Sequence, residues 1–391
     1  MQRLAADPAN RVVFITQRRD GELPGVTKIV YTPERPHGKG VHRYLRDTEA
    51  GVLNAQAVMR AALELKRSGF VPDLMLGHNG WGEIWYLKDA FPQSPLLGYF
   101  EFFYRSEGAD VGFDPAMAPS LDDAPRLRTK NLGNLLGLAA ADAGQCPTQW
   151  QKSVYPAIHH GKLNVVHEGI DTDKVRPDPQ AWLRMPKKDL TLSRNDEVLT
   201  YVARNLEPYR GFPSFMRSLP EILDRRPKAH VLIVGGDETS YGPPPPNGKT
   251  FRDLMLEELG SSIDGSRVHF LGKVAYPIFL KVLQVSTAHV YLTYPFVLSW
   301  SMLEAMSAGC LVIGSRTPPV QEVIRDGDNG ILVDFFRPQE IADRAVEALE
   351  NPGAFAAIRD RARKTIAANY DLNTICLPGQ LSLVRSLCAA S

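Results

Sequence analysis

The segment of residues 290–314 constrains the fold of this chain more than any other stretch of its sequence. Its first apolar run, over residues 290–294, predicts a β-strand that ends before a proline. A helical pattern follows, with Ser299 placed as its N-cap and Gly309 placed to end it. A second apolar run follows directly, over residues 311–314. The segment is therefore predicted to be a β-loop-α-β unit with free backbone N–H groups at the helix start.

The start of this helix is a candidate anion-binding site, because unsatisfied N–H donors and the helix dipole both attract phosphate. Glu304 stands about one turn into the helix. A carboxylate at that place does not bind phosphate, so two roles remain open for it. It accepts hydrogen bonds from ribose hydroxyls, or it only complements the helix dipole. An ordinary βαβ turn is the alternative for the whole segment.

The rest of the chain alternates strand and helix patterns without a clear hairpin signature, which predicts doubly wound parallel sheets, one in each half. A length of 391 residues favours two domains. The charged, proline-bearing stretch 173–196 marks the boundary. We therefore expect an N-terminal domain of residues 1–180, completed by a returning segment 370–391, and a C-terminal domain of residues 181–369.

Composition narrows the class of protein. A hydrophobic content of 44% and a charged content of 23% are typical of a soluble globular chain. The net charge of +1 gives no field that favours nucleic acid. The four cysteines lack metal-ligand spacing, and neither a signal peptide nor a membrane-spanning apolar run is recognised. We expect a cytoplasmic protein, whose oligomeric state the sequence does not indicate.

A basic segment in the first half has two interpretations, a solvated loop or a surface for an anionic acceptor or lipid headgroups. Its basic residues are Arg35, His37, Lys39, His42, Arg43 and Arg46. The second interpretation allows peripheral contact with the inner face of a membrane.

Polar side chains follow two consecutive predicted strands of the first half. His78 opens a polar, glycine-containing stretch after the strand 74–77, and Glu101 follows the strand 95–100. Ligands of open α/β sheets bind beyond the carboxyl ends of the strands. His78 and Glu101 are therefore candidate catalytic residues, and purely structural polar residues are the alternative.

The segment around Glu304 resembles the donor-site signature of the family 4 retaining glycosyltransferases. That signature has two glutamates eight positions apart, the second beginning Glu-Ala-Met-Ala-x-Gly. Here Glu304 begins Glu-Ala-Met-Ser-Ala-Gly, but Phe296 stands in the place of the first glutamate. The resemblance implies a GT-B fold, in which two Rossmann-like domains face a cleft and a C-terminal helix crosses back to the N-domain.

Two arginines resemble the basic pair of a family motif, Gly-Arg-x-x-x-x-Lys-Gly, which contacts the donor diphosphate. Arg204 matches the first basic residue, and Arg210 replaces the lysine. Two guanidinium groups are suited to neutralise a departing diphosphate; a surface arginine pair is the alternative. Neither arginine lies on an apolar face, so we expect folding to tolerate the loss of either one.

The resemblance implies further site residues. The donor-binding residues expected from it are Arg204, Arg210, Gly236, Val274, Val297, Leu298, Ser299, Trp300 and Glu304. Family members often place a histidine at an N-domain strand end beside the reacting sugar. Glu101 occupies the comparable place here, with His78 one strand earlier as the alternative.

The activity implied is metal-independent glycosyl transfer with retention, from a nucleoside-diphosphate sugar to a glycan, a lipid-linked or a small-molecule acceptor. The resemblance implies that no metal is needed. The Asp-x-Asp matches at 171–173 and 326–328, a motif that holds a metal in another transferase architecture, are interpreted as turns. A nucleotide-sugar epimerase or hydrolase of the same fold is an alternative, and so is a degenerate, non-catalytic partner subunit. An NAD-dependent enzyme is disfavoured, because no G-x-G-x-x-G follows the first strand.

Phe296 leaves two ways to hold the sugar without the first signature glutamate. Backbone N–H groups of residues 297–299 bind it unaided, or the donor presents an apolar feature, such as a deoxy carbon, to the ring.

Overall fold

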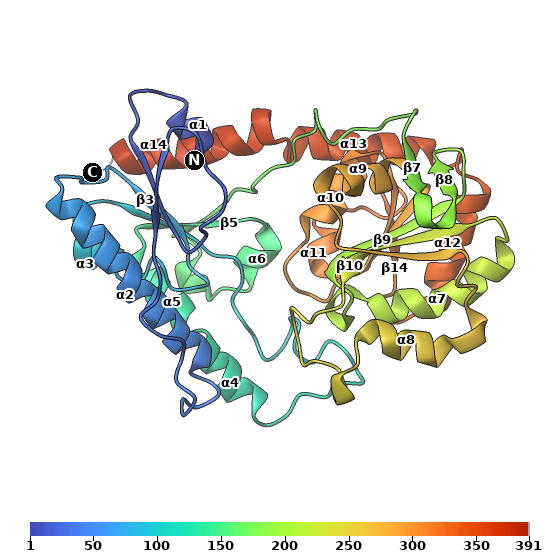
Figure 1. Ribbon diagram of the computed structural model, residues 1–391, viewed down its shortest axis with the longest axis horizontal. Coiled ribbons are helices and arrows are strands. Elements are labelled where there is room, and N and C mark those ends of the chain that lie inside the picture. Colours follow the sequence, from blue (N-terminus) through green and yellow to red (C-terminus); the bar gives the residue numbers. More distant parts are fainter. Residues whose placement is uncertain (390–391) are drawn as a thin grey trace. The chain divides into compact units, whose positions relative to one another are not determined.

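The computed structural model describes residues 1–389, which divide into two compact units (Figure 1). Unit 1 contains residues 1–166 and the segment from residue 379 onward, and unit 2 contains residues 167–378. The division therefore falls earlier than the expected residue 180, and the returning segment starts later than residue 370. The reason is that the proline-bearing stretch packs into unit 2, where Val175 is buried in the core.

Unit 1 is built on a parallel four-stranded sheet in the order β3-β4-β5-β6, with a separate parallel pair β1-β2. The strands are β1 (Val12–Thr16), β2 (Val26–Val30), β3 (Met75–His78), β4 (Leu96–Tyr99), β5 (Ala143–Cys146) and β6 (Leu163–Val165). The helices of its main segment are α1 (Gln2–Ala5), α2 (Arg46–Arg67), α3 (Leu87–Ala90), α4 (Asp123–Lys130), α5 (Leu132–Ala140) and α6 (Gln149–Ser153). The helical pattern over 126–141 is thus two helices, which meet at Asn131.

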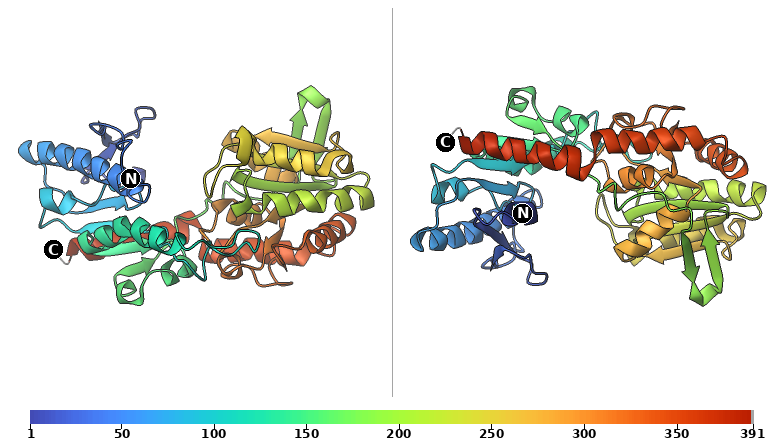
Figure 2. Two further views of the ribbon diagram at one scale, coloured as in Figure 1. Left: turned by 90° about the horizontal axis from the view of Figure 1, so that it is seen from below. Right: turned by 90° about the horizontal axis from the view of Figure 1, so that it is seen from above.

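The last helix, α14 (Leu377–Ala389), carries the returning segment of unit 1. Figure 2 shows it beside α1, and residues of both helices line one hollow in the surface of unit 1. The returning C-terminal helix that the family resemblance implied is therefore present. Among residues 1–389, the structure contains no helix with the length and apolarity that a membrane crossing requires.

Unit 2 is built on a parallel six-stranded sheet in the order β11-β10-β9-β12-β13-β14. The strands are β9 (Val198–Asn205), β10 (His230–Gly236), β11 (Val268–Gly272), β12 (Ala288–Tyr291), β13 (Leu311–Ser315) and β14 (Ile331–Val333). The helices are α7 (Phe212–Arg225), α8 (Phe251–Leu259), α9 (Tyr276–Val285), α10 (Trp300–Ser307), α11 (Pro318–Gln321), α12 (Pro338–Glu350) and α13 (Ala356–Asn369). The strand order reverses between β9 and β12, and doubly wound sheets bind ligands at such a switch point.

An antiparallel hairpin in unit 2 departs from the expected strict βα alternation. It pairs β7 (Trp182–Met185) with β8 (Leu190–Ser193), and it projects from unit 2 in Figure 2. It packs against α9, where Lys281 lies over the ring of Trp182. The hairpin was not predicted from the sequence because its turn contains no glycine. Asp189 adopts the left-handed conformation instead, with φ of 47°.

Candidate active site

The switch point of unit 2 carries the β-loop-α-β unit predicted from residues 290–314. The loop of residues 292–299 joins β12 to α10. Ser299 is extended, and its hydroxyl accepts from the Ser301 N–H, as an N-cap does. Gly309 follows the helix with φ of 81°, the left-handed conformation that ends helices. The predicted helix start and helix end are therefore both confirmed.

Arg210 is buried, with 7% of its surface exposed, and it holds the 292–299 loop in place. Its Nη1 donates to the Val297 carbonyl oxygen at 2.9 Å and to Thr293 Oγ1 at 2.8 Å. A longer contact of 3.3 Å joins it to the hydroxyl of Tyr291. Arg210 is thus buried and hydrogen-bonded, so the structure favours a loss of stability on its removal rather than the tolerance expected from the sequence. Arg204, at the end of β9, is exposed, so that expectation stands for it.

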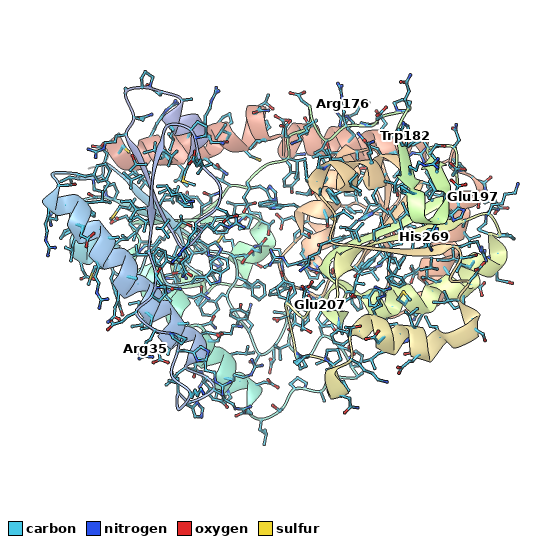
Figure 3. The ribbon with its side chains drawn as sticks, viewed as in Figure 1. Arg35, Arg176, Trp182, Glu197, Glu207 and His269 are labelled. Carbon is cyan, nitrogen blue, oxygen red and sulfur yellow. The ribbon has the colours of Figure 1, made fainter. Side chains whose placement is uncertain are left out.

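Glu207 lies between the two arginines and was not singled out from the sequence. Its side chain is fully buried, and Oε2 accepts the backbone N–H groups of Ser240 (3.2 Å) and Tyr241 (2.8 Å). Its Oε1 has no hydrogen-bond partner among residues 1–389, and burial raises the pKa of this carboxyl. Glu207 therefore joins the 206–211 loop to the loop of residues 237–250. Figure 3 shows Glu207 at one end of unit 2's sheet and His269 toward the other.

Phe296 packs into a cluster of aromatic rings and has 6% of its surface exposed. Its ring makes edge contacts with Tyr241, at 5.0 Å between centroids, and with Tyr209, at 5.6 Å. Tyr209 in turn stacks on Tyr294 at 4.7 Å. We call these four residues the aromatic cluster. Little of the Phe296 ring remains to contact a sugar, which favours the backbone interpretation of its role.

Glu304 lies in α10 and accepts a hydrogen bond from the hydroxyl of Tyr276, at 2.7 Å from its Oε1. Burial raises the pKa of this carboxyl. Trp300 begins α10, is half exposed, and donates from its indole N–H to Glu168 Oε2 at 3.2 Å. The hydroxyl of Tyr276 and the carboxylate of Glu168 are two partners that the sequence did not reveal.

The remaining expected donor residues also lie at the carboxyl ends of unit 2's strands. Gly236 ends β10, and a Cβ atom there would collide with the side chains of Glu238 and Lys273. Val274 follows β11, and Leu298 is buried in the 292–299 loop. The structure thus gathers the predicted donor residues at one end of one sheet.

The two Asp-x-Asp segments are engaged locally. Asp171 accepts the Lys174 N–H at 3.1 Å. In the second segment, Asp326 pairs with Arg316 at 3.2 Å, and Asp328 pairs with Arg325 at 2.7 Å. Each segment therefore behaves as a turn with its own partners.

Unit 1 contains a separate pocket of about 320 Å³ at the carboxyl ends of β3 and β4. The two residues predicted there lie together, with His78 Nε2 at 3.9 Å from Glu101 Oε2. The lining also includes residues of α2, α4 and α5: Asp47, Thr48, Ala50, Gly51, Asn54, Lys130, Gly133 and Asn134. The His78–Glu101 pair was predicted from consecutive strand ends, whereas the contributions of the three helices were not.

His78 is a neutral imidazole held in one orientation. Its Nδ1 accepts the Gly80 N–H at 2.9 Å, which leaves the proton on Nε2, the nitrogen nearer Glu101. The ring contacts those of Trp81 and Tyr99, at 4.3 Å and 5.1 Å between centroids. Burial lowers the pKa of His78 to about 4, so it is uncharged at neutral pH.

Asparagine side chains fix the walls of this pocket. Asn79 Oδ1 accepts the indole N–H of Trp85 at 3.0 Å, and its amide donates to Asn134 at 3.1 Å. Asn134 also donates to the Phe102 carbonyl oxygen at 3.0 Å, and so ties α5 to the segment after β4. Asn54 of α2 donates to the Trp81 carbonyl oxygen at 2.8 Å. Asn134, an asparagine inside the apolar helix α5, was the one sequence signal that could have indicated this role.

Both halves of the chain match family models, and these matches define the class of protein. Residues 8–175 match the model described as Glycosyl transferase family 4 group, and residues 196–351 match Glycosyl transferases group 1. The structure resembles sucrose-phosphate synthase from Thermosynechococcus elongatus (TM-score 0.74, 17% identity, 100% of this chain and 92% of that one). It also resembles the Anabaena protein HepE, solved with UDP and glucose (TM-score 0.61, 18% identity, 92% and 87% covered).

The fold is therefore GT-B, and the chain belongs to the family 4, group 1 glycosyltransferases. Its curated relatives include the D-inositol 3-phosphate glycosyltransferase of Rhodococcus jostii, 26% identical over 242 residues, or 60% of this chain and 51% of the relative. That of Mycobacterium avium is 25% identical over 251 residues, or 63% and 56%. The chain spans about half the length of these relatives.

Proposed function

We propose that this chain is a retaining, metal-independent glycosyltransferase that moves a hexose-type sugar from a nucleoside-diphosphate sugar to a hydroxyl-bearing acceptor. The observation that carries the proposal is Arg210, a buried cation that joins the 206–211 and 292–299 loops at the switch point of unit 2's sheet. A buried cation at the start of a helix, at the place where such sheets bind ligands, suits a diphosphate.

The chemistry assigned to unit 2 is stabilisation of the leaving group. As the bond between the sugar and the diphosphate breaks, positive charge develops on the sugar ring and negative charge on the diphosphate. Arg204, Arg210 and the N-terminus of α10 stabilise the negative charge, which is the larger part of the catalytic effect. Glu304 accepts from the ribose hydroxyls, and the absence of a side chain at Gly236 lets the diphosphate approach the backbone.

The chemistry assigned to unit 1 is recognition of the acceptor. Neutral His78 donates from Nε2, and Glu101 accepts, so that together they orient a hydroxyl group. Trp81 is 60% exposed beside them and offers an aromatic face to the C–H groups of a sugar or polyol. The names of the relatives, which specify D-inositol 3-phosphate, support a hydroxyl-rich acceptor. Glycans, lipid-linked saccharides and small molecules all meet this description.

The biological setting we propose is synthesis of surface polysaccharide or glycoconjugates in the cytoplasm, with peripheral membrane contact through residues 35–46. Parts of that basic segment are already engaged: Arg35, labelled in Figure 3, pairs with Glu49 at 2.8 Å, and Arg43 pairs with Asp122. The remaining basic side chains would meet an anionic surface. Retained binding to anionic vesicles after all remaining basic residues of the segment are replaced would contradict this role.

The test begins with a binding screen. Thermal shift assays identify the nucleotide that the protein binds. The compounds are UDP, GDP and ADP, together with UDP-glucose, GDP-mannose and ADP-glucose. UDP is tested first because HepE was solved with it. Turnover is then measured with and without sugar and polyol acceptors, in the presence of EDTA. NMR of the product reads the anomeric configuration. We expect acceptor-dependent, EDTA-insensitive transfer with retention.

Each rival function has its own outcome in this test. Consumption of the donor without an acceptor indicates an epimerase or a hydrolase. Nucleotide binding without turnover on any acceptor favours a non-catalytic partner subunit. Failure to bind every nucleotide contradicts the proposal itself.

A further inference from the structure

Tyr241 lies between Arg210, which the proposed function assigns to the donor's diphosphate, and Phe296, which occupies the sugar-binding position of the family signature. Its ring centroid lies 5.5 Å from the guanidinium carbon of Arg210, the proposed diphosphate ligand. The same ring lies 5.0 Å from that of Phe296, which stands where the family signature has its sugar-binding glutamate. Tyr241 therefore contacts both Arg210 and Phe296 with one ring.

The position of Tyr241 is fixed by a buried carboxylate. Glu207 Oε2 accepts the backbone N–H groups of Ser240 and Tyr241, so the start of the 237–250 loop is tied to the loop between the two arginines. Prolines at 243–246 follow, and each restricts the backbone φ angle. A side chain on a loop held in this way loses little entropy when it binds a ligand.

Among these residues, Tyr241 is suited to replace the missing carboxylate. Phe296 has no hydrogen-bonding atom in its side chain, and the aromatic cluster covers its ring. Tyr241 is partly exposed and combines a hydroxyl, which donates and accepts, with a ring that contacts C–H groups.

We propose that Tyr241 is a specificity-determining residue for the transferred sugar, which it contacts with its hydroxyl and ring in place of the signature glutamate. The inference rests on the proposed function, because it requires a nucleotide-sugar donor at this site. A neutral phenol makes a weaker hydrogen bond than a carboxylate, and its ring favours an apolar sugar face. The class of donor expected is therefore a neutral hexose or deoxyhexose.

The deciding variant is Tyr241→Phe, which removes the hydroxyl and keeps the ring. Calorimetry measures its affinity for the nucleoside diphosphate and for the matching nucleotide sugar of the screen. We expect the affinity for the nucleotide sugar to fall about threefold to tenfold, which is the range for one neutral hydrogen bond. The affinity for the nucleoside diphosphate should stay within about twofold. The kcat/KM ratio between UDP-glucose and UDP-galactose, or the corresponding epimer pair for another nucleotide, should also shift.

The control is Lys249→Ala in the same loop. Lys249 is exposed, pairs with Glu257 at 2.6 Å, and should leave both affinities unchanged. Equal loss of both affinities in Tyr241→Phe, or an unchanged ratio between epimeric donors, would show that Tyr241 only supports the fold and would overturn the inference. If the wild-type protein binds no nucleoside diphosphate, the proposed function fails instead, so the two failures are distinguishable.

Discussion

The candidate sites of the two units are built in different ways. The site in unit 2 consists of three loops at the end of one sheet, joined by the buried side chains of Arg210 and Glu207. The pocket in unit 1 is lined by side chains from two strand ends and three helices, joined by asparagine amides. Buried side chains that hold loops therefore define the first site, and side chains that line a pocket define the second.

This difference has energetic consequences. A buried charge that holds a loop contributes to folding and to binding together, because its removal leaves buried polar groups without partners. Glu101, by contrast, is partly exposed at its pocket, so it can be changed with less effect on stability. Variants at the buried Arg210 of unit 2 should therefore lower stability and activity together, whereas variants at Glu101 of unit 1 should lower activity alone.

The largest effect is expected from Arg210→Ala. Turnover should fall by about 10²-fold or more, the scale of losing one preorganised charge contact. The melting temperature should fall as well, because Val297 and Thr293 lose their buried donor, at about 1–3 kcal/mol for each unsatisfied group. Activity assays and calorimetry measure the two effects.

Arg204→Ala is the matched control for the joint loss of stability and activity expected in Arg210→Ala. It should lower turnover on the same scale without lowering the melting temperature, because Arg204 is exposed. Unaltered turnover in both variants would remove the role assigned to the arginine pair.

The contrast also explains how much the sequence could predict. Parallel sheets in both units follow from alternating apolar runs, and the ends of α10 follow from Ser299 and Gly309, because these signals are local. The β7–β8 hairpin was missed because Asp189 performs the turn that glycine usually makes.

The site residues that were missed depend on partners far along the chain. Glu207 binds backbone groups more than thirty positions later, and Asn134 accepts from Asn79, which lies 55 positions earlier. Nothing near Glu207 in the sequence marks it, because a carboxylate in a loop is ordinarily solvated. Such residues can be recognised only once the fold brings their partners together.

A second prediction tests whether unit 1 separates activity from stability. Glu101→Gln removes the charge and keeps the shape, so transfer should fall about tenfold or more while nucleoside diphosphate affinity stays unchanged. Steady-state kinetics and calorimetry on one preparation suffice. A parallel fall in nucleotide affinity would mean that Glu101 does not belong to the acceptor side.

A third prediction concerns Glu304, whose carboxylate meets the hydroxyl of Tyr276. Glu304→Ala should weaken nucleoside diphosphate binding about tenfold, the effect of losing one charged hydrogen bond to ribose. Tyr276→Phe is the control, because it removes the partner and keeps the carboxylate. If the 2′,3′-dideoxynucleotide loses affinity to the same extent in Glu304→Ala as the normal nucleotide does, the ribose contact is refuted.

The smallest effect is expected in the acid stability of the two units. Burial lowers the pKa of His78 in unit 1 to about 4, and lowers that of His269 in unit 2 to about 4 with a further contribution from Lys188. Between about pH 6.5 and pH 4 the unfolded chain binds a proton that the native histidine does not, so stability falls as the pH falls through this window. The slope per histidine is at most about 1.4 kcal/mol per pH unit.

His78→Gln should therefore reduce the loss of stability between pH 7 and pH 5 in unit 1 only, and His269→Gln should reduce it in unit 2 only. Hydrogen exchange followed by mass spectrometry resolves the units at both pH values. An equal change in both units from either variant would show that they unfold as one, and would remove the energetic separation on which the comparison of the two sites depends.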